Sequence, residues 1–170
     1  MSKVLIVVDM QKDFIDGALG SAEAQGIVEN VKRKIESFDG TVIFTQDTHG
    51  EDYMSTQEGK KLPIPHCIED TEGWEIHPEL KELVENCITK PTFGSIILPE
   101  YICDLLGEEP DVVELVGLCT DICVISNAMI LKASFPEAKI TVDGSCCAGV
   151  TPQSHKNALD AMASVQIEVL

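Results

Sequence analysis

The stretch Asp111-Val-Val-Glu-Leu-Val-Gly-Leu-Cys-Thr-Asp-Ile-Cys123, followed by the apolar run 124–133, decides the fold class. Its β-branched residues before the glycine predict a buried strand that ends in a tight turn. Thr120 and Asp121 offer N-cap oxygens, and the run after them contains good helix formers. We therefore expect a strand, a turn and a helix with Cys123 in the first helical turn, where the helix dipole favours a thiolate.

Strands and helices alternate along the rest of the chain, and no internal repeat interrupts them. This pattern predicts an α/β fold, a three-layer doubly wound parallel sheet of about six strands, in a single domain over residues 1–170. The expected strands cover residues 4–8, 41–45, 86–90, 112–116, 139–143 and 165–169, and the expected helices cover 23–38, 78–85, 96–106, 120–133 and 152–163. The polar stretch 50–75 lacks periodicity, and so long a loop in a compact domain is more often functional than a linker.

The composition excludes several classes of partner. The 170 residues include 12 basic and 29 acidic side chains, a net charge of −17, without any basic cluster. Nucleic acid and anionic membrane are therefore not expected as partners. The opening apolar run is too short for a signal peptide or a membrane span. Seven cysteines without the spacing of a disulfide framework indicate a reduced, cytoplasmic setting.

Four reactive side chains follow the predicted strands: Asp9, Asp47, Lys90 and Cys123. In open parallel sheets, ligands bind outside the carboxyl ends of the strands, so these side chains are expected to meet. A cysteine hydrolase needs a base for the thiol proton and a group that holds the resulting charges. Asp9 is therefore assigned as proton acceptor and Lys90 as the stabilising cation. Taken singly, each has an alternative interpretation: a turn aspartate, a solvated lysine, a structural cysteine.

A second group of residues has the chemistry of metal ligands. Asp47 and His49 follow a predicted strand, and Glu58 and His66 lie in the long polar loop. Imidazoles and carboxylates together suit zinc, iron or manganese. The alternative is that these histidines are surface residues of a polar loop. The two other histidines, at positions 77 and 155, lack partners in sequence and are interpreted as structural.

These segments together resemble the isochorismatase-like cysteine hydrolases, closest to the nicotinamidase/pyrazinamidase group. The resemblance covers almost the whole chain. It is carried by Val8-Asp-Met-Gln-Lys-Asp-Phe14, by the stretch from Thr45-Gln-Asp-Thr-His49 to Pro65-His-Cys67, by Lys90, and most specifically by Gly117-Leu-Cys-Thr-Asp-Ile-Cys-Val124. No glycine pattern of a nucleotide-binding loop follows any predicted strand.

The resemblance implies an amidohydrolase that cleaves a small amide, foremost nicotinamide to nicotinate and ammonia, through a thioester intermediate. It implies that Asp9, Lys90 and Cys123 are the catalytic residues. It also implies a divalent metal, zinc first and iron or manganese next, with Asp47, His49, Glu58 and His66 as its ligands. Relatives of this kind commonly self-associate, so a homo-oligomer is expected.

The resemblance further implies a cis peptide bond between Leu118 and Cys119. This bond would aim the Cys119 N–H, beside that of Cys123, at an oxyanion. Phe14 corresponds to an aromatic that stacks on the substrate, and Leu118 is also expected to contact it. The sequence departs from the family pattern at Cys119, where a small residue is usual. It departs again in the stretch 62–65, where an aromatic side chain is missing and Trp74 is expected to compensate.

Three alternatives remain open from the sequence. The first is a related hydrolase of another small amide, of a carbamoyl compound or of an isochorismate-like ether, although ether cleavage needs no thiol nucleophile. The second is a metal- or ligand-binding protein without turnover. The third is a redox role for Cys119 and Cys123, whose C-x₃-C spacing differs from that of thioredoxin-like sites.

Overall fold

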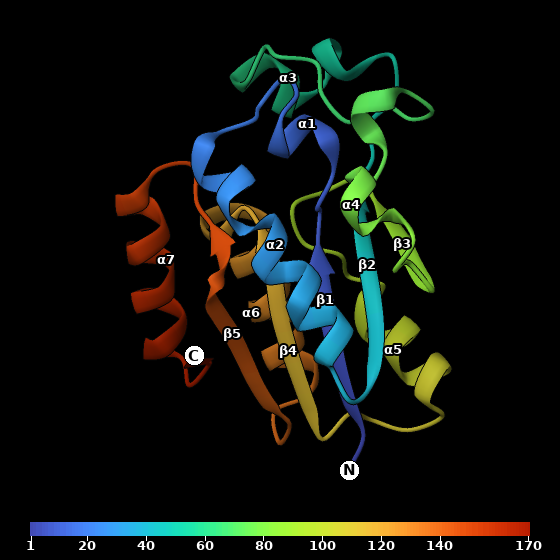
Figure 1. Cartoon of the computed structure of the whole chain (residues 1–170), viewed down its shortest axis with the longest axis vertical. Helices are drawn as coiled ribbons and strands as arrows, with labels where there is room; N and C mark the ends of the chain where they lie inside the picture. Colours follow the sequence, from blue (N-terminus) through green and yellow to red (C-terminus); the bar gives the residue numbers. More distant parts are fainter.

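A computed structural model describes residues 1–170 and contains a six-stranded parallel sheet of order β3-β2-β1-β4-β5-β6 (Figure 1). The chain builds outward from β1 to β3, crosses back to place β4 beside β1, and then builds outward again. This reversal makes the sheet doubly wound, with its switch point between β1 and β4. The strands are β1 (Lys3–Val8), β2 (Thr41–Asp47), β3 (Asn86–Lys90), β4 (Val112–Leu118), β5 (Lys139–Ala148) and β6 (Glu168–Val169).

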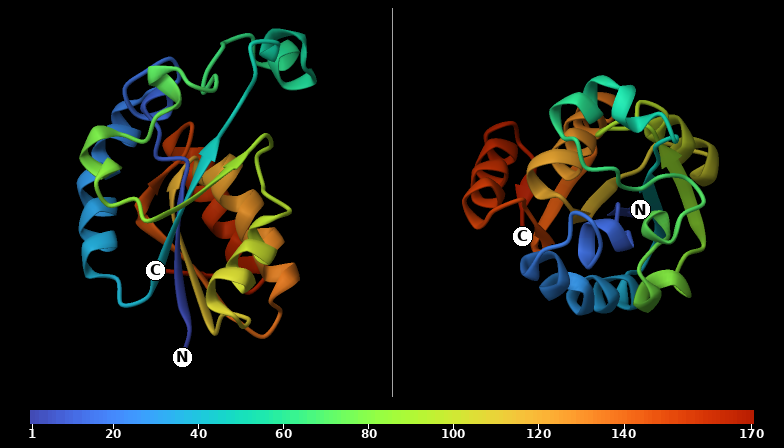
Figure 2. Two further views of the ribbon diagram at one scale, coloured as in Figure 1. Left: turned by 90° about the vertical axis from the view of Figure 1, so that its right-hand side faces the viewer. Right: turned by 90° about the horizontal axis from the view of Figure 1, so that it is seen from above.

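Helices cover both faces of the sheet, which gives three layers (Figure 2). On one face, α1 (Lys12–Ile15), α2 (Ala22–Ser37) and α4 (Pro78–Lys81) contribute to one apolar core. On the other, α5 (Leu98–Leu106), α6 (Ile125–Ser134) and α7 (Pro152–Ser164) contribute to a second core. The expected three-layer α/β fold is confirmed. None of the helices combines the length and the apolarity that a membrane crossing requires.

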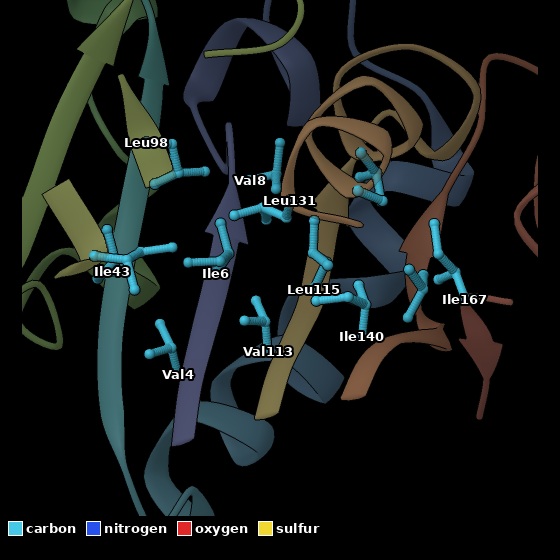
Figure 3. Close-up of a cluster of buried hydrophobic side chains, with 14 of the residues drawn as sticks. Val4, Ile6, Val8, Ile43, Leu98, Val113, Leu115, Leu131, Ile140 and Ile167 are labelled. Atoms are coloured by element: carbon cyan, nitrogen blue, oxygen red, sulfur yellow. The ribbon is translucent and has the colours of Figure 1, made fainter. Parts of the chain in front are cut away.

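Strand β1 shows why the predicted strands are apolar throughout. Val4, Ile6 and Val8 point into the core that α5, α6 and α7 cover, as Figure 3 shows. Leu5 and Val7 point into the opposite core, against α2. All five are fully buried because parallel strands covered on both faces have no solvated side.

The segments that cross the carboxyl edge of the sheet contain more short helices than the sequence predicted. Helix α1 lies in a stretch expected to be a loop, and the stretch 50–75 contains η1 (Tyr53–Ser55), α3 (Gln57–Lys61) and η2 (Glu72–Trp74). In Figure 1, α1 and α3 lie above the upper, carboxyl ends of the strands. These helices are too short for apolar residues to recur at helical spacing, so the hydrophobic pattern of the sequence does not predict them.

The turn after β4 differs from the predicted helix start. A π-helical turn, η3 (Thr120–Val124), precedes α6, and its N-cap is Cys119. Thr120 Oγ1 instead lies 2.7 Å from His155 Nδ1, and Asp121 Oδ1 accepts a hydrogen bond from the Val150 N–H. The predicted capping role of Thr120 and Asp121 is therefore wrong, because both side chains tie the turn to α7 and to the loop before it.

Gly117 permits the close approach of strands at the switch point. Its φ is +112°, and a Cβ at this position would lie 2.2 Å from the Val8 carbonyl oxygen. The register between β4 and β5 also shifts between Leu115 and Gly117. Only glycine combines this backbone conformation with this space, so β4 can turn sharply beside the end of β1.

A partly buried ion-pair cluster fixes α2 to the sheet. Lys34 Nζ lies 2.7 Å from Glu114 Oε1 on β4 and 2.7 Å from Asp143 Oδ2 on β5. Burial raises the pKa of Asp143, but hydrogen bonds from Lys34 and Ser145 outweigh burial and hold that pKa below its usual value. The charged carboxylate of Asp143 is thus the form that the folded chain favours.

We predict that Lys34→Met lowers the free energy of unfolding at pH 7 by about 1–2 kcal/mol, because two carboxylates lose a partly solvated cation. Since the pKa of Asp143 is lowered in the folded state, this stabilisation is present above the unfolded pKa and is lost as the pH falls. The difference from wild type should therefore shrink below about pH 4. Urea unfolding at pH 7 and pH 3.5 measures it. Lys32→Met, on the same helix at a lysine without an ion pair, is the control and should stay near wild type.

Candidate active site and metal centre

The strand register brings three charged side chains to one edge of the sheet. Asp47 pairs with Lys90 between β2 and β3, and Val8 pairs with Thr45 between β1 and β2. Asp9 follows directly, with a φ of +49°, and its Oδ1 accepts a 2.6 Å hydrogen bond from Thr45 Oγ1. The three predicted strand-end groups therefore meet because their strands are neighbours in a parallel sheet.

The ammonium group of Lys90 lies at the centre of this arrangement. Its Nζ lies 2.6 Å from Asp9 Oδ2, 3.3 Å from Asp47 Oδ1 and 3.5 Å from Cys123 Sγ. It also donates a 3.1 Å hydrogen bond to the carbonyl oxygen of Thr92. Lys90 and Asp9 are only 1% and 0% exposed. One buried cation thus contacts an acid, a thiol and a candidate metal ligand.

Burial and neighbouring charge set the pKa values of these groups. Burial lowers the pKa of Lys90, but the charges of Asp9, Cys123 and Asp47 outweigh burial, so the pKa lies above its usual value. Burial raises the pKa of Asp9, and the opposing effect of Lys90 does not fully offset it. Lys90 is therefore a permanent cation here, and Asp9 is a stronger base than a solvated aspartate.

The Cys123 thiol does not have the low pKa that its position near a helix start predicted. Burial raises the pKa of this thiol well above its usual value, the charge of Asp9 raises it further, and Lys90 only partly opposes them. Burial therefore outweighs the cation beside this thiol, and the thiolate that the helix position predicted is not the favoured resting form. A reaction that uses this sulfur needs a base to take its proton.

The turn that carries Cys123 has the predicted backbone geometry. The peptide bond between Leu118 and Cys119 is cis, as the resemblance implied. The Cys119 N–H makes no hydrogen bond within the chain, so it is free to donate to a bound oxygen.

Asn127 is a polar residue of this site that the sequence interpretation missed. It is fully buried, and its Nδ2 donates to the carbonyl oxygens of Cys123 and Phe93 at 2.8 and 3.2 Å. Its Oδ1 accepts from the Ser95 N–H at 2.9 Å. It ties the turn that carries Cys123 to the segment after β3. The only hint in the sequence is that Asn127 is an amide side chain within the apolar run 124–133.

The four predicted metal ligands form one cluster. Their ligand atoms all lie within 4.8 Å of one another, and the four residues are Asp47, His49, Glu58 and His66. His66 Nδ1 lies 2.8 Å from the Ile64 carbonyl oxygen, so the ring donates there and leaves Nε2 as the free ligand atom. Two imidazoles and two carboxylates suit a divalent zinc, iron or manganese ion.

The charges around the cluster also fit a cation. Asp9, Asp47 and Glu58 are carboxylates within this region, whereas Lys90 is the cation that contacts two of them. Burial without enough positive charge is costly for carboxylates. A divalent ion held by His49 and its three neighbours would balance the remaining negative charge, so the residues present fit the metal that the resemblance implied.

Gln11 holds the backbone of the candidate metal ligand Asp47, a role that the sequence did not reveal. Its Oε1 accepts from the Asp47 N–H and its Nε2 donates to the Asp47 carbonyl oxygen, both at 2.8 Å. Nε2 also donates to the Trp74 carbonyl oxygen at 2.8 Å. The amide thus pairs with the end of β2 as a neighbouring strand would. The only hint in the sequence is a polar residue three positions after the end of a buried strand.

A cavity of about 520 Å³ opens beside Cys123 and the candidate metal ligands. Phe14 and Leu118 line it, as expected for substrate contacts, and so do Cys119 and Cys123. Trp74 does not line this cavity, because its indole N–H donates to Thr48 Oγ1 at 2.8 Å. The structure therefore contradicts the expected substrate contact of Trp74.

The lining of the cavity includes further residues that the sequence interpretation did not predict. Leu62, Phe93, Ile122 and Val150 contribute to its wall, and Leu62 belongs to the stretch that lacks the expected aromatic side chain. Asp47, Glu58 and His66 are its polar residues on the metal side. One end of the cavity, called the reactive end below, therefore contains Cys123 and the candidate metal ligands. The rest of the cavity wall is mainly apolar.

The chain is similar to known proteins in both sequence and fold. A family profile described as the Isochorismatase domain matches residues 3–170. The nicotinamidase/pyrazinamidase of Mycobacterium tuberculosis is 27% identical over 186 aligned positions, which cover 99% of this chain and 98% of the relative.

Two solved structures are similar over nearly the whole chain. The pyrazinamidase of Pyrococcus horikoshii in complex with zinc has a TM-score of 0.84 at 26% identity, and the match covers 100% of this chain and 99% of that one. The nicotinamidase PncA from Bacillus subtilis has a TM-score of 0.83 at 28% identity, with 99% of each chain covered.

We predict that the chelator-treated protein takes up one zinc ion per chain, and that His66→Ala abolishes this stoichiometric binding. Gln11→Met should weaken the affinity by about 10–100-fold, because residues that orient a ligand commonly contribute that much. Competition against a chromophoric chelator measures both. His77→Ala is the control, since this histidine contacts the start of α4 and lies outside the cluster. Unchanged zinc affinity in His66→Ala would rule out the cluster as the metal centre.

Proposed function

The chain belongs to the isochorismatase family, and we propose that it is a cysteine-dependent amidohydrolase that cleaves nicotinamide to nicotinate and ammonia. It is a hydrolase of amide carbon–nitrogen bonds, the activity for which its relatives are named. The observation that carries the finer proposal is the contact of Lys90 Nζ with both Cys123 Sγ and Asp9 Oδ2, at 3.5 and 2.6 Å.

The first step is proton transfer from the Cys123 thiol to Asp9. The raised pKa of Asp9 makes its carboxylate a suitable base, and the raised pKa of Cys123 means that the base is required. Lys90 contacts both groups and stabilises the thiolate as it forms. Because Lys90 keeps its charge throughout, it acts through its field and does not donate the proton.

The second step is attack of the Cys123 sulfur on the amide carbonyl carbon. A carbon–sulfur bond forms, and the carbonyl oxygen becomes an oxyanion. The free N–H of Cys119, together with that of Cys123, is assigned as its hydrogen-bond donor. Loss of one such donor costs about 2.7–4 kcal/mol of transition-state stabilisation in well-studied hydrolases.

The remaining steps release the two products. Asp9 returns its proton to the leaving nitrogen, the carbon–nitrogen bond breaks, and ammonia departs from a thioester on Cys123. Asp9 then takes a proton from water, which attacks the thioester carbon. The carbon–sulfur bond then breaks, nicotinic acid leaves and loses its proton to solvent as nicotinate, and Asp9 returns its proton to the sulfur, so the chain returns to its starting state.

Two further groups position the substrate in this proposal. Asp47, His49, Glu58 and His66 would hold a divalent metal, which we take to be zinc. When bound, that ion would supply a coordination position for the ring nitrogen of the substrate. The ring of Phe14, which is 5.4 Å from the ring of His66, provides an apolar surface beside this group.

We predict that Cys123→Ala shows no ammonia release from nicotinamide above background, since loss of the nucleophile costs about 10⁶ in kcat in a well-studied serine protease. Asp9→Asn should lower kcat by about 10²–10⁴, because it removes the base. A coupled ammonia assay on zinc-loaded protein measures both. Cys103→Ser, at a half-buried thiol on α5, is the control and should retain activity. Intact turnover by Cys123→Ala would refute the mechanism.

A further inference from the structure

Three large apolar side chains line the catalytic cavity and yet remain exposed. Leu62 is 37% exposed, Phe93 is 46% exposed and Val150 is 60% exposed. They come from the loop after α3, the segment after β3 and the loop before α7, which are distant in sequence. A lone exposed apolar residue is ordinary, but several around one cavity indicate a binding surface.

The charge distribution of the cavity points to an uncharged, apolar occupant. The chain has a net charge of −17, yet the only charged side chains on the cavity wall are Asp47 and Glu58. Both belong to the metal cluster. The remaining wall away from the reactive end consists mainly of small or apolar residues, including Ala18, Leu19 and Ala24.

The size of the cavity exceeds the need of a single-ring amide. Cavities of roughly 300–1,000 Å³ hold drug-sized ligands, and this one has a volume of about 520 Å³. Leu62 stands in the stretch 62–65, which lacks the aromatic side chain that the resemblance implied, and the small residues Ala18 and Gly149 also lie on the cavity wall. Space therefore remains beyond a pyridine carboxamide held at the reactive end.

We propose that this apolar wall binds an additional group on the substrate, so that the preferred substrates are aza-aromatic carboxamides with an alkyl substituent or a second fused ring. The added group would lie against Leu62, Phe93 and Val150, while the carboxamide lies at Cys123. This inference rests on the proposed amidase function. The reaction remains hydrolysis, in which the substituted amide and water give the substituted carboxylate and ammonia.

Quinoline-3-carboxamide, which is nicotinamide with a fused benzene ring, tests the proposal on zinc-loaded wild-type protein. We expect its KM to be about tenfold below that of nicotinamide, because the added carbons would be only partly buried against this exposed wall, which keeps the gain well below the roughly fourfold that each fully buried carbon contributes. Ammonia release over a range of concentrations gives KM and kcat for both amides. The quantity to compare is the ratio of their kcat/KM values.

Two variants of the exposed wall test where the added ring lies. Phe93→Ser and Val150→Ser should each reduce the preference for quinoline-3-carboxamide over nicotinamide by about threefold or more. Both side chains are substantially exposed, so their replacement leaves the cores intact. Val165→Ser is the matched control, since this valine is 41% exposed at the end of α7 and does not line the cavity. It should keep the wild-type preference.

The outcomes separate this inference from the proposed function. A wild-type preference for the fused-ring amide that both wall variants reduce supports the inference. Hydrolysis of nicotinamide with no preference for the larger amide overturns it and leaves the proposed function standing. A preference that neither Phe93→Ser nor Val150→Ser changes also overturns it. Failure to hydrolyse either amide overturns the proposed function and this inference together.

Discussion

The buried ammonium group of Lys90 is the interaction on which the candidate site depends. A lysine cation that is almost without solvent contact needs negative partners, since the effective cost of burying a charge is several kcal/mol. Asp9 and Asp47 provide them, and both lie within 3.3 Å of Nζ. Because the same group contacts Cys123, the charge that stabilises the buried acids also stabilises a thiolate. Lys90 thereby joins the proposed nucleophile, its base and the metal cluster into one electrostatic unit.

The sheet creates this unit through register and connectivity. Parallel pairing of β1, β2 and β3 places their carboxyl ends side by side, so acids and lysine from distant parts of the chain meet without any direct sequence signal between them. The crossing to β4 brings Cys123 to the same edge, and Gly117 allows the backbone to turn there beside Val8. Gln11 and Asn127 then hold the ends of these segments through hydrogen bonds to backbone groups.

Much of this could be predicted from the sequence, and the misses have physical reasons. Apolar runs revealed the strands, and the order of strands and helices revealed the doubly wound sheet, so Asp9, Lys90 and Cys123 could be expected at one edge. The indole N–H of Trp74 donates to Thr48 and the residue does not line the cavity, a hydrogen bond that no sequence pattern encodes. The pKa of Cys123 depends on how deeply the fold buries it, and helix position alone predicted the opposite direction. The roles of Gln11 and Asn127 could not be predicted, because the hydrogen-bond partners of these buried amides are backbone atoms of other segments.

The site therefore combines a compact charged end with a wider apolar remainder, and its central claim concerns the sulfur of Cys123. The most direct measurement is rapid acid quench of zinc-loaded enzyme during nicotinamide turnover, followed by peptide mass spectrometry. Our account predicts a nicotinoyl group attached to Cys123 and absent from Cys119, four residues earlier in the same turn. Steady turnover with no acylated cysteine, or with acylation confined to Cys119, would contradict it.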